Sequence, residues 1–376
     1  MASKFELSIS TSYVPDWGIV EAFRELFQNA LDNQTINPDN KMGWEYDGDK
    51  VIISNKTSKL SVESLLLGNG TKHDDERTIG KHGEGYKIAF MVLLRNNKKI
   101  KVYNYGAKEI WEVRLVNSKR YNGQQIPTVF VEKEAIWKKA PSSDLIIEVS
   151  GVDASEYLEI KEKNLHLRSE DIKKFSVPGK GDILLDSNEK GNIYVNGLFV
   201  QNNQNLHYGY NFDPRVLNLD RDRRLVDSFN VQWQSSILWS KAAKDSEELK
   251  EVAVKLVNDN CYDTSYVKST VYYCDCKTEL LDAVAEDFYK EYGDDAVPVT
   301  NNTDYKLVER SNEGKPVIVS ENKADIIKKS SIIKEHVEIK VKSLKTRFED
   351  FLSKIESKLE DDELEEFREL INEIED

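Results

Sequence analysis

The stretch Glu25–Asn33 reads ELFQNALDN and lies in an apolar-periodic segment, 16–33, that predicts a helix. At about 100° per residue, Glu25, Asn29 and Asp32 fall within about 60° of one another, opposite the apolar stripe. A carboxylate can orient and deprotonate water, and an amide oxygen is a hard ligand suited to Mg²⁺. Any amphipathic helix also turns a polar face to solvent, so a functional face and a solvated face are both open interpretations.

A glycine-rich segment follows and runs straight into an apolar stretch, 85–94, that predicts a buried helix. Its sequence is Gly80-Lys81-His82-Gly83-Glu84-Gly85. Glycines let backbone N–H groups approach a ligand closely, and a helix N-terminus suits phosphate. Lys72 and the polar stretch 73–78 precede it and are typical of a flap. A single glycine loop is more often only a turn, so it indicates a phosphate-binding site only in combination with the first helix.

Together the two segments resemble the GHKL superfamily, which includes the gyrase B subunit, the ninety-kilodalton heat-shock chaperone, histidine kinases and MutL. Residues 25–33 are similar to its E-x-x-x-N-x-x-D box, and residues 68–85, GNGTKHDDERTIGKHGEG, are similar to its ATP lid and closing glycine motif. The resemblance implies ATP as the ligand, with Glu25 as general base, Asn29 as the Mg²⁺ ligand and Asp32 beside the nucleotide. The residues that it places around the phosphates are Lys72, Gly80, Lys81, His82, Gly83 and Gly85.

The chain departs from the family after its second expected strand. The family has Asp-x-Gly-x-Gly there, whereas this chain has Asn55, Thr57 and Lys59 at the three positions. Asn55 can accept from a base through its oxygen, or turn its NH₂ group toward a different base edge. Base selectivity is therefore open, and a degenerate pocket without nucleotide is an alternative. Ser142 or Ser143 stands where the family has a later threonine.

A second resemblance covers residues 192–227, which are similar to the start of the heat-shock chaperone's middle domain. An arginine there reaches the γ-phosphate, and the matching residue is Arg221. Gyrase and MutL use a lysine from the same domain, which makes Lys180 a rival. Arginine suits the role because it makes planar, bidentate contacts with phosphate. Simple surface pairing of Arg221 with neighbouring aspartates is the alternative.

Composition narrows the classes of protein. The chain has 376 residues and a formal net charge of −14, so bulk electrostatic binding to DNA is excluded, although a local basic patch stays open. No apolar run approaches the roughly 20 residues of a membrane-spanning helix, and the N-terminus lacks a signal-peptide core. Three cysteines are too few for a disulfide framework. These features predict a reduced, cytoplasmic protein without a membrane contact.

The resemblance implies a Bergerat-type two-layer α/β sandwich, a mixed sheet with helices on one face, over residues 1–165. A smaller α/β transducer-like domain is expected over 166–259, with NIYVNGLFV as one strand and 226–259 as helix. A small α/β domain is expected over 260–340, with KSTVYY and KLVER as strands. Residues 341–376 form an acidic tail whose apolar spacing predicts one amphipathic helix, packed on its own domain or on a partner as a short coiled coil.

These features predict a Mg²⁺-dependent ATPase, a slow hydrolase whose nucleotide closes the lid and drives a conformational switch acting on a partner macromolecule. The alternative is a non-hydrolysing nucleotide sensor or protein-interaction module with a degenerate adenine pocket. A protein partner is expected through the C-terminal region. The resemblance also makes a nucleotide-bound homodimer an option, and direct binding of nucleic acid stays open.

Overall fold

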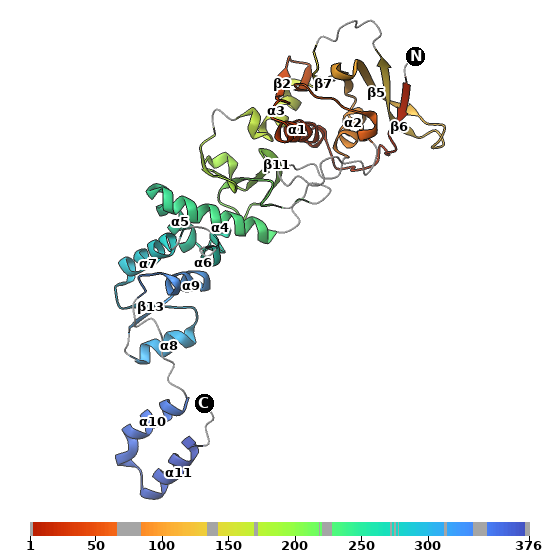
Figure 1. Cartoon of the computed structure of the whole chain (residues 1–376). Coiled ribbons are helices and arrows are strands. Elements are labelled where there is room, and N and C mark those ends of the chain that lie inside the picture. The colour runs from red at the N-terminus through yellow and green to blue at the C-terminus, as the bar shows by residue number, and fades with distance from the viewer. Residues whose placement is uncertain are drawn as a thin grey trace. The chain divides into compact units, whose positions relative to one another are not determined.

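A computed structural model of the chain describes residues 3–65, 84–133, 142–168, 172–217, 219, 228–270, 273, 276, 278–311, 314–333 and 344–372. The chain divides into two compact units, Met1–Trp239 and Ser240–Asp376 (Figure 1). Within the described ranges, each helix is either too short or too polar to cross a lipid bilayer.

The first unit contains a seven-stranded sheet with the strand order β1-β6-β5-β4-β7-β3-β2. Its strands are β1 (Ser3–Glu6), β2 (Met42–Tyr46), β3 (Lys50–Asn55), β4 (Lys99–Asn104), β5 (Glu109–Asn117), β6 (Gln125–Lys133) and β7 (Leu145–Ser150). Burial alternates along the central strands, so that one face of the sheet is apolar and covered. Strand β1 pairs with β6 and forms one edge of the sheet.

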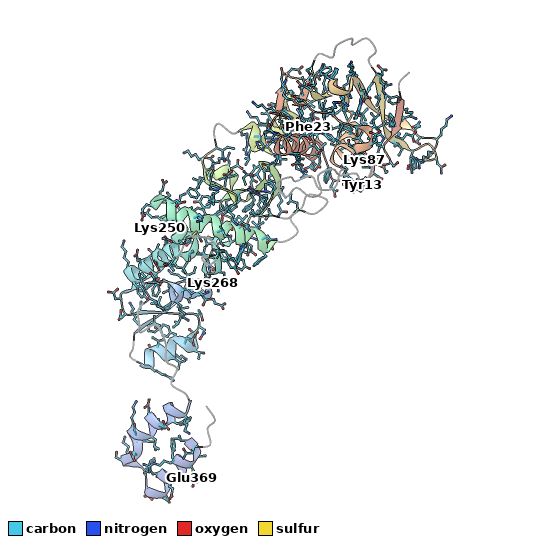
Figure 2. All side chains as sticks on the ribbon, viewed as in Figure 1. Tyr13, Phe23, Lys87, Lys250, Lys268 and Glu369 are labelled. Atoms are coloured by element: carbon cyan, nitrogen blue, oxygen red, sulfur yellow. The ribbon has the colours of Figure 1, made fainter. Side chains whose placement is uncertain are left out.

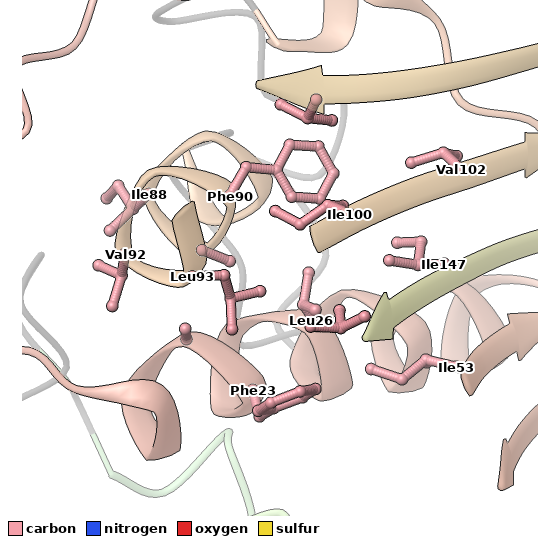
Figure 3. Close-up of a cluster of buried hydrophobic side chains, with 14 of the residues drawn as sticks. Phe23, Leu26, Ile53, Ile88, Phe90, Val92, Leu93, Ile100, Val102 and Ile147 are labelled. Carbon is pink, nitrogen blue, oxygen red and sulfur yellow. The ribbon is translucent and has the colours of Figure 1, made fainter. Parts of the chain in front are cut away.

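Helices α1 (Ile19–Ile36) and α2 (Gly85–Arg95) pack on each other and on this apolar face, while α3 (Ala154–Glu162) packs on α1. Figure 3 shows Phe23 and Leu26 of α1 with Phe90 and Leu93 of α2, gathered around Ile53, Ile100 and Ile147 of the strands. Phe23 and Phe90 are fully buried, and such side chains each contribute about 2–3 kcal/mol to stability. This core fixes α1 and α2 side by side.

The expectation of a mixed sheet is wrong, because every strand pair of this sheet is antiparallel. The connection through α2 makes β3 and β4 parallel to each other, as a helical crossover does. Strand β7 then inserts between them and pairs with both in the antiparallel sense. The coarser expectation, a mixed α/β fold with helices against one sheet face, is confirmed.

Helix α1 begins at Ile19, three residues later than the sequence predicts. Gly18 is extended, and the Glu21 carboxylate accepts a hydrogen bond of 2.8 Å from the Gly18 N–H. This contact closes a capping box that sets the first turn. Because the start is fixed, the polar residues of α1 keep a defined rotation relative to α2.

A second, five-stranded sheet of the first unit has the order β11-β10-β12-β9-β8. Its strands are β8 (Lys174–Val177), β9 (Gly181–Leu184), β10 (Asn192–Val195), β11 (Leu198–Asn202) and β12 (Gly209–Phe212). The stretch NIYVNGLFV is thus a hairpin and not one strand. Asn196 and Gly197 both have positive φ, 48° and 77°, which is the signature of a tight two-residue turn. On this sheet, Trp239 donates a 2.8 Å hydrogen bond to the Tyr210 hydroxyl.

Helix α4 (Ser228–Asp245) leads into the second unit, and the expected long helix breaks where Ser246 caps the next one. The other elements are α5 (Glu247–Asn258), α6 (Val267–Thr270), α7 (Glu279–Tyr292), β13 (Ala296–Val299), α8 (Asn302–Ser311), β14 (Lys315–Ile318) and α9 (Glu321–Lys329). Strands β13 and β14 form a parallel pair. Figure 2 labels Lys250 of α5 and Lys268 of α6, and Lys268 forms an ion pair with Asp325.

Two expected strands of this unit are wrong. KLVER lies in α8 and the start of KSTVYY lies in α6. In α8, buried Val308 joins Val297 and Val299 of β13, so the helical face supplies the apolar contact that the strand was expected to make. Cys261 is free and buried, as the expectation of reduced cysteines requires of this residue.

The acidic tail forms two helices, α10 (Leu344–Ile355) and α11 (Asp361–Asn372), where one was expected. The break at 356–360 folds them into a hairpin, in which Arg368 pairs with Glu356 at 2.8 Å. Only Leu352 and Ile371 of the described tail are buried. Phe351 stays 52% exposed, so the apolar seam is only partly covered.

Candidate functional site

The polar face of α1 is buried. Glu25 is 1% exposed and Asp32 is 0% exposed, although both carry charge-bearing side chains. Buried carboxylates are uncommon, because removal from water disfavours the charged form unless partners compensate. The interpretation of this face as a solvated surface is therefore wrong for Glu25 and Asp32, which lie in the interior, whereas Asn29 is half-buried.

Gly85, the last residue of the glycine segment, lies against this face. A Cβ atom placed on Gly85 would lie 2.8 Å from Glu25 Oε2 and 2.8 Å from Asn29 Nδ2. A side chain there would displace both groups, so the absence of a side chain is what allows the close approach. The start of α2 and the polar face of α1 thus meet at Glu25 and Asn29.

Asn29 is oriented by its own helix. Its Nδ2 donates a 2.9 Å hydrogen bond to the Glu25 backbone carbonyl, and no described residue donates to its Oδ1. An amide oxygen beside a carboxylate is a donor set that fits Mg²⁺, which binds few protein groups and completes its shell with phosphate and water. Within the described part of the chain, His, Cys, Asp and Glu form no cluster of three that would hold a metal by themselves.

Arg24 is a neighbour of Glu25 that spacing arguments did not single out. One of its terminal nitrogens lies 3.8 Å from Glu25 Oε1, and its guanidinium lies over the Trp17 ring at 5.0 Å from the centroid. The Arg24 side chain is 13% exposed, so the pair is only weakly screened by solvent. The positive charge lies next to the buried carboxylate and partly compensates its charge.

Asp32 acts on the first turn of α2. Burial, with a contribution from the Asp32 charge, raises the pKa of the Tyr86 hydroxyl above its usual value. Tyr86 therefore stays protonated and neutral at physiological pH. Asp32 is buried in α1, one turn beyond Asn29.

The contacts of Asn55 decide between its oxygen and its NH₂ group as the atom that could meet a base. It is 2% exposed, and its Nδ2 donates to the Ala30 carbonyl at 2.9 Å and to the Asn40 carbonyl at 3.0 Å. Both amide hydrogens are used within the protein, so the NH₂ group is not directed at a base edge. Asn55 instead ties the end of β3 to α1 and to the connection before β2.

The loop after β3 is held by polar side chains that sequence reasoning missed. Asp144 pairs with Lys56 at 2.7 Å and accepts from the Thr57 N–H at 3.2 Å. Against the effect of burial, these hydrogen bonds lower the pKa of the Asp144 carboxyl. Buried Asn104 donates to the Leu60 carbonyl at 2.6 Å. Each contact joins groups more than 40 positions apart, so no local pattern reveals it.

Two of the remaining candidates lie among the described residues and are not part of this cluster. Lys180 lies in the β8–β9 turn, where its carbonyl accepts from Asp213, and no hydrogen bond or ion pair of the described residues links it to Glu25 or Asn29. Ser142 accepts from the backbone N–H of Asp144 at 3.1 Å and so supports the loop. The candidates that lie outside the described residues are Lys72, Gly80, Lys81, His82, Gly83 and Arg221.

Comparison with known proteins gives little further. No family model matches the chain. The chain is similar to an uncharacterized protein of Mycoplasma pneumoniae, with 25% identity over 229 residues, which is 58% of this chain and 90% of the relative. The relative carries no functional description, so the site must be interpreted from its own geometry.

Proposed function

We propose that the first unit is a GHKL-type ATPase domain with a Bergerat-type sandwich, which binds Mg²⁺–ATP at the face shared by α1 and α2. The observation that carries the proposal is the approach of Gly85 to both Glu25 and Asn29. Two motifs whose contacting residues, Glu25 and Gly85, are 60 positions apart in the sequence thereby meet at one point. The buried carboxylate and the oriented amide oxygen supply the chemistry that magnesium nucleotide hydrolysis needs.

In the proposed reaction, Glu25 accepts a proton from a water molecule as its oxygen bonds to the γ-phosphorus. The bond from that phosphorus to the β–γ bridging oxygen breaks, and ADP and phosphate leave. Arg24 supplies a positive charge beside Glu25, at 3.8 Å from its Oε1. Asn29 would hold Mg²⁺, which supplies charge compensation to the phosphates.

Phosphate release with Mg²⁺–ATP tests the proposal. Glu25→Gln should retain nucleotide binding and lose turnover by at least about 100-fold, as expected for loss of a general base. Asn29→Ala should lose the Mg²⁺-dependent part of binding. Glu45→Gln, at an exposed carboxylate of β2, is the matched control. Equal turnover in wild type and Glu25→Gln would remove the assigned base.

Gly85→Ala tests directly whether the close approach of Gly85 to Glu25 and Asn29 is needed for nucleotide binding. The added methyl group displaces Glu25 and Asn29, while alanine favours the helix by about 1 kcal/mol over glycine. We therefore expect a fold of equal or greater stability with reduced nucleotide binding and turnover. Unchanged binding would show that the two motifs need not approach each other.

A second candidate is a non-hydrolysing nucleotide sensor, favoured by the contacts of Asn55. Because its NH₂ group is bound to two backbone carbonyls, recognition of the base there is limited to its oxygen. A thermal shift with ATP and GTP separates the candidates. A shift without phosphate release supports the sensor, and shifts of similar size for both nucleotides support loss of base selectivity.

A further inference from the structure

The acidic tail folds into a helical hairpin whose two helices are only partly packed (Figure 1). Helices α10 and α11 have 12 residues each, and isolated helices of that length are marginal in water. Within the described tail, only Leu352 and Ile371 are buried. The hairpin therefore needs a further apolar surface against it to be stable.

A groove of about 360 Å³ lies between the two helices. Its apolar lining comes from Leu352 of α10 and Ile371 of α11, and its charged lining residues are Glu349, Glu356 and Arg368. Arg368 pairs with Glu356 at 2.8 Å, so Glu349 leaves the groove with a negative charge. The two apolar side chains line the groove without filling it, which leaves room for apolar side chains of another segment.

Further apolar side chains extend this surface beyond the groove. Phe348 and Phe351 of α10 both contact the Phe367 ring, with centroid distances of 6.3 and 6.5 Å. Phe348, Phe351 and Leu370 nevertheless stay exposed. Single exposed apolar side chains are normal on a protein surface, whereas a group of them on one element is typical of an interaction surface.

The rest of the second unit offers no matching apolar face among its described residues. Outside the hairpin, its exposed large apolar side chains are Tyr262, Tyr273 and Ile318. These three lie at separate places along the chain, and Ile318 belongs to β14. They do not form a continuous strip that would cover the hairpin. Another molecule is therefore the better candidate for the missing surface.

The charge of the hairpin limits what can cover it. Ten acidic and five basic residues lie between Leu344 and Asn372, and α11 alone has six acidic residues and one basic residue. Glu363 and Glu366 share a face of α11 with exposed Leu370, because they lie seven and four positions before it. A second copy would bring like charges together, whereas a basic segment would meet opposite ones.

We propose that the α10–α11 hairpin is a docking site for a basic amphipathic helix of a partner protein. The apolar face of that helix would cover Leu352, Ile371 and Phe351, and its lysine or arginine side chains would lie beside Glu349 and Glu366. A helix of about 12 residues would match the length of α10. The site is independent of the proposed nucleotide site, because it uses no residue of the first unit.

Binding of a labelled synthetic peptide to the full chain, measured by fluorescence anisotropy without nucleotide, tests the proposal. The probe is a peptide of about 14 leucine and lysine residues, with the leucines on one helical face. Wild type should bind it at least about tenfold more tightly than a peptide in which glutamate replaces lysine. A peptide of the same composition in scrambled order has no apolar face and should also bind at least about tenfold more weakly.

Two exposed positions separate the apolar contribution from the charged one. Phe351→Ser should weaken binding of the basic peptide at least about tenfold, whereas Leu158→Ser, at an exposed leucine of α3, should not. Glu349→Lys should reduce the preference for the basic over the acidic peptide at least about fivefold. Glu251→Lys, at an exposed residue of α5, should leave that preference unchanged. Urea unfolding of each variant checks that the fold persists.

Equal binding of the three peptides to wild type, or no binding of the basic one, would overturn the proposal. Sedimentation of the full chain at several concentrations tests a second copy as the occupant. A wild-type dimer that Phe351→Ser dissociates would assign this face to self-association and would also overturn the proposal. None of these results affects the phosphate-release test, which concerns the first unit.

Discussion

Replacing Asn55 by aspartate would restore the residue that the resembled family has at this position, yet we expect it to damage this protein. The Asn55 Nδ2 group donates to the Ala30 and Asn40 carbonyls, at 2.9 and 3.0 Å. An aspartate carboxylate has no hydrogen to donate, so its oxygens would be repelled by the Ala30 and Asn40 carbonyl oxygens. The side chain is 2% exposed, which leaves little room for water to replace the lost contacts.

The magnitude follows from the contacts. Two neutral hydrogen bonds contribute about 1 kcal/mol each, and leaving their carbonyl acceptors without donors adds desolvation costs of similar size. An uncompensated buried charge raises the total, so we expect the free energy of unfolding to fall by about 3–5 kcal/mol at pH 8. A loss of that size is a large share of the stability of a typical domain.

The sign of the pH dependence separates this cause from simple loss of packing. Burial among carbonyls raises the pKa of the new carboxyl above its unfolded value of about 3.9. Its protonated form is favoured in the folded state, so stability is retained below that pH and lost as pH rises through the folded pKa. Urea unfolding of Asn55→Asp at pH 5 and pH 8 measures this effect. Asn117→Asp, at an exposed site on β5, is the control.

The reasoning is refuted if Asn55→Asp unfolds at the wild-type urea concentration. It also fails if the loss of stability is the same at both pH values, because the buried charge would then not be its cause.

Three further predictions concern the supports of the site. Thr57 has φ of 48°, which costs a β-branched residue about 1–2 kcal/mol. Thr57→Gly removes this strain but adds the backbone entropy of glycine, so the free energy of unfolding in urea should rise by a net of about 0.5–1 kcal/mol. Arg95 donates to four backbone carbonyls of residues 11–17, so Arg95→Met should lose about 2–4 kcal/mol in urea unfolding, whereas exposed Arg114→Met should not. Asp144 has a lowered pKa, so its contribution is present above about pH 4 and lost as pH falls through its folded pKa. In a series of urea unfolding measurements at different pH values, the free energy of unfolding of Asp144→Asn should therefore fall less at acid pH than that of wild type.

The parts of the site that could be predicted are those that local periodicity determines. The 3.6-residue pattern placed Glu25, Asn29 and Asp32 on one face, and the apolar run after Gly85 indicated the second helix. Their burial could not be predicted, because an amphipathic pattern does not say whether a polar face meets water or another element. Packing of α1 on α2 decides that question.

The contacts of Asn55 could not be predicted for a different reason. Its partners are backbone carbonyls 25 and 15 positions away, and a carbonyl is present at every residue. Sequence therefore gives no sign of which ones accept. KLVER illustrates a third limit, since a short apolar run between charged residues fits a strand as well as one face of a helix. Its place in α8 is set by contact with β13.

The loop after β3 offers a last test of whether its departure from the family pattern is one adaptation or two independent ones. Asn55 and Thr57 lie in the same turn. The double variant Asn55→Asp with Thr57→Gly restores both family residues, and it combines the destabilising effect of a buried charge with the stabilising effect of relieved backbone strain. If the sites are independent, the gain of about 1 kcal/mol at Thr57 offsets only a fraction of the loss at Asn55, and the urea midpoint stays well below that of wild type. If glycine instead lets the turn move so that the aspartate reaches Lys56, the double variant recovers most of its stability, with a coupling energy above about 1 kcal/mol. We expect the first result, because Asp144 already holds both Lys56 and the Thr57 N–H, and the glycine keeps that backbone contact.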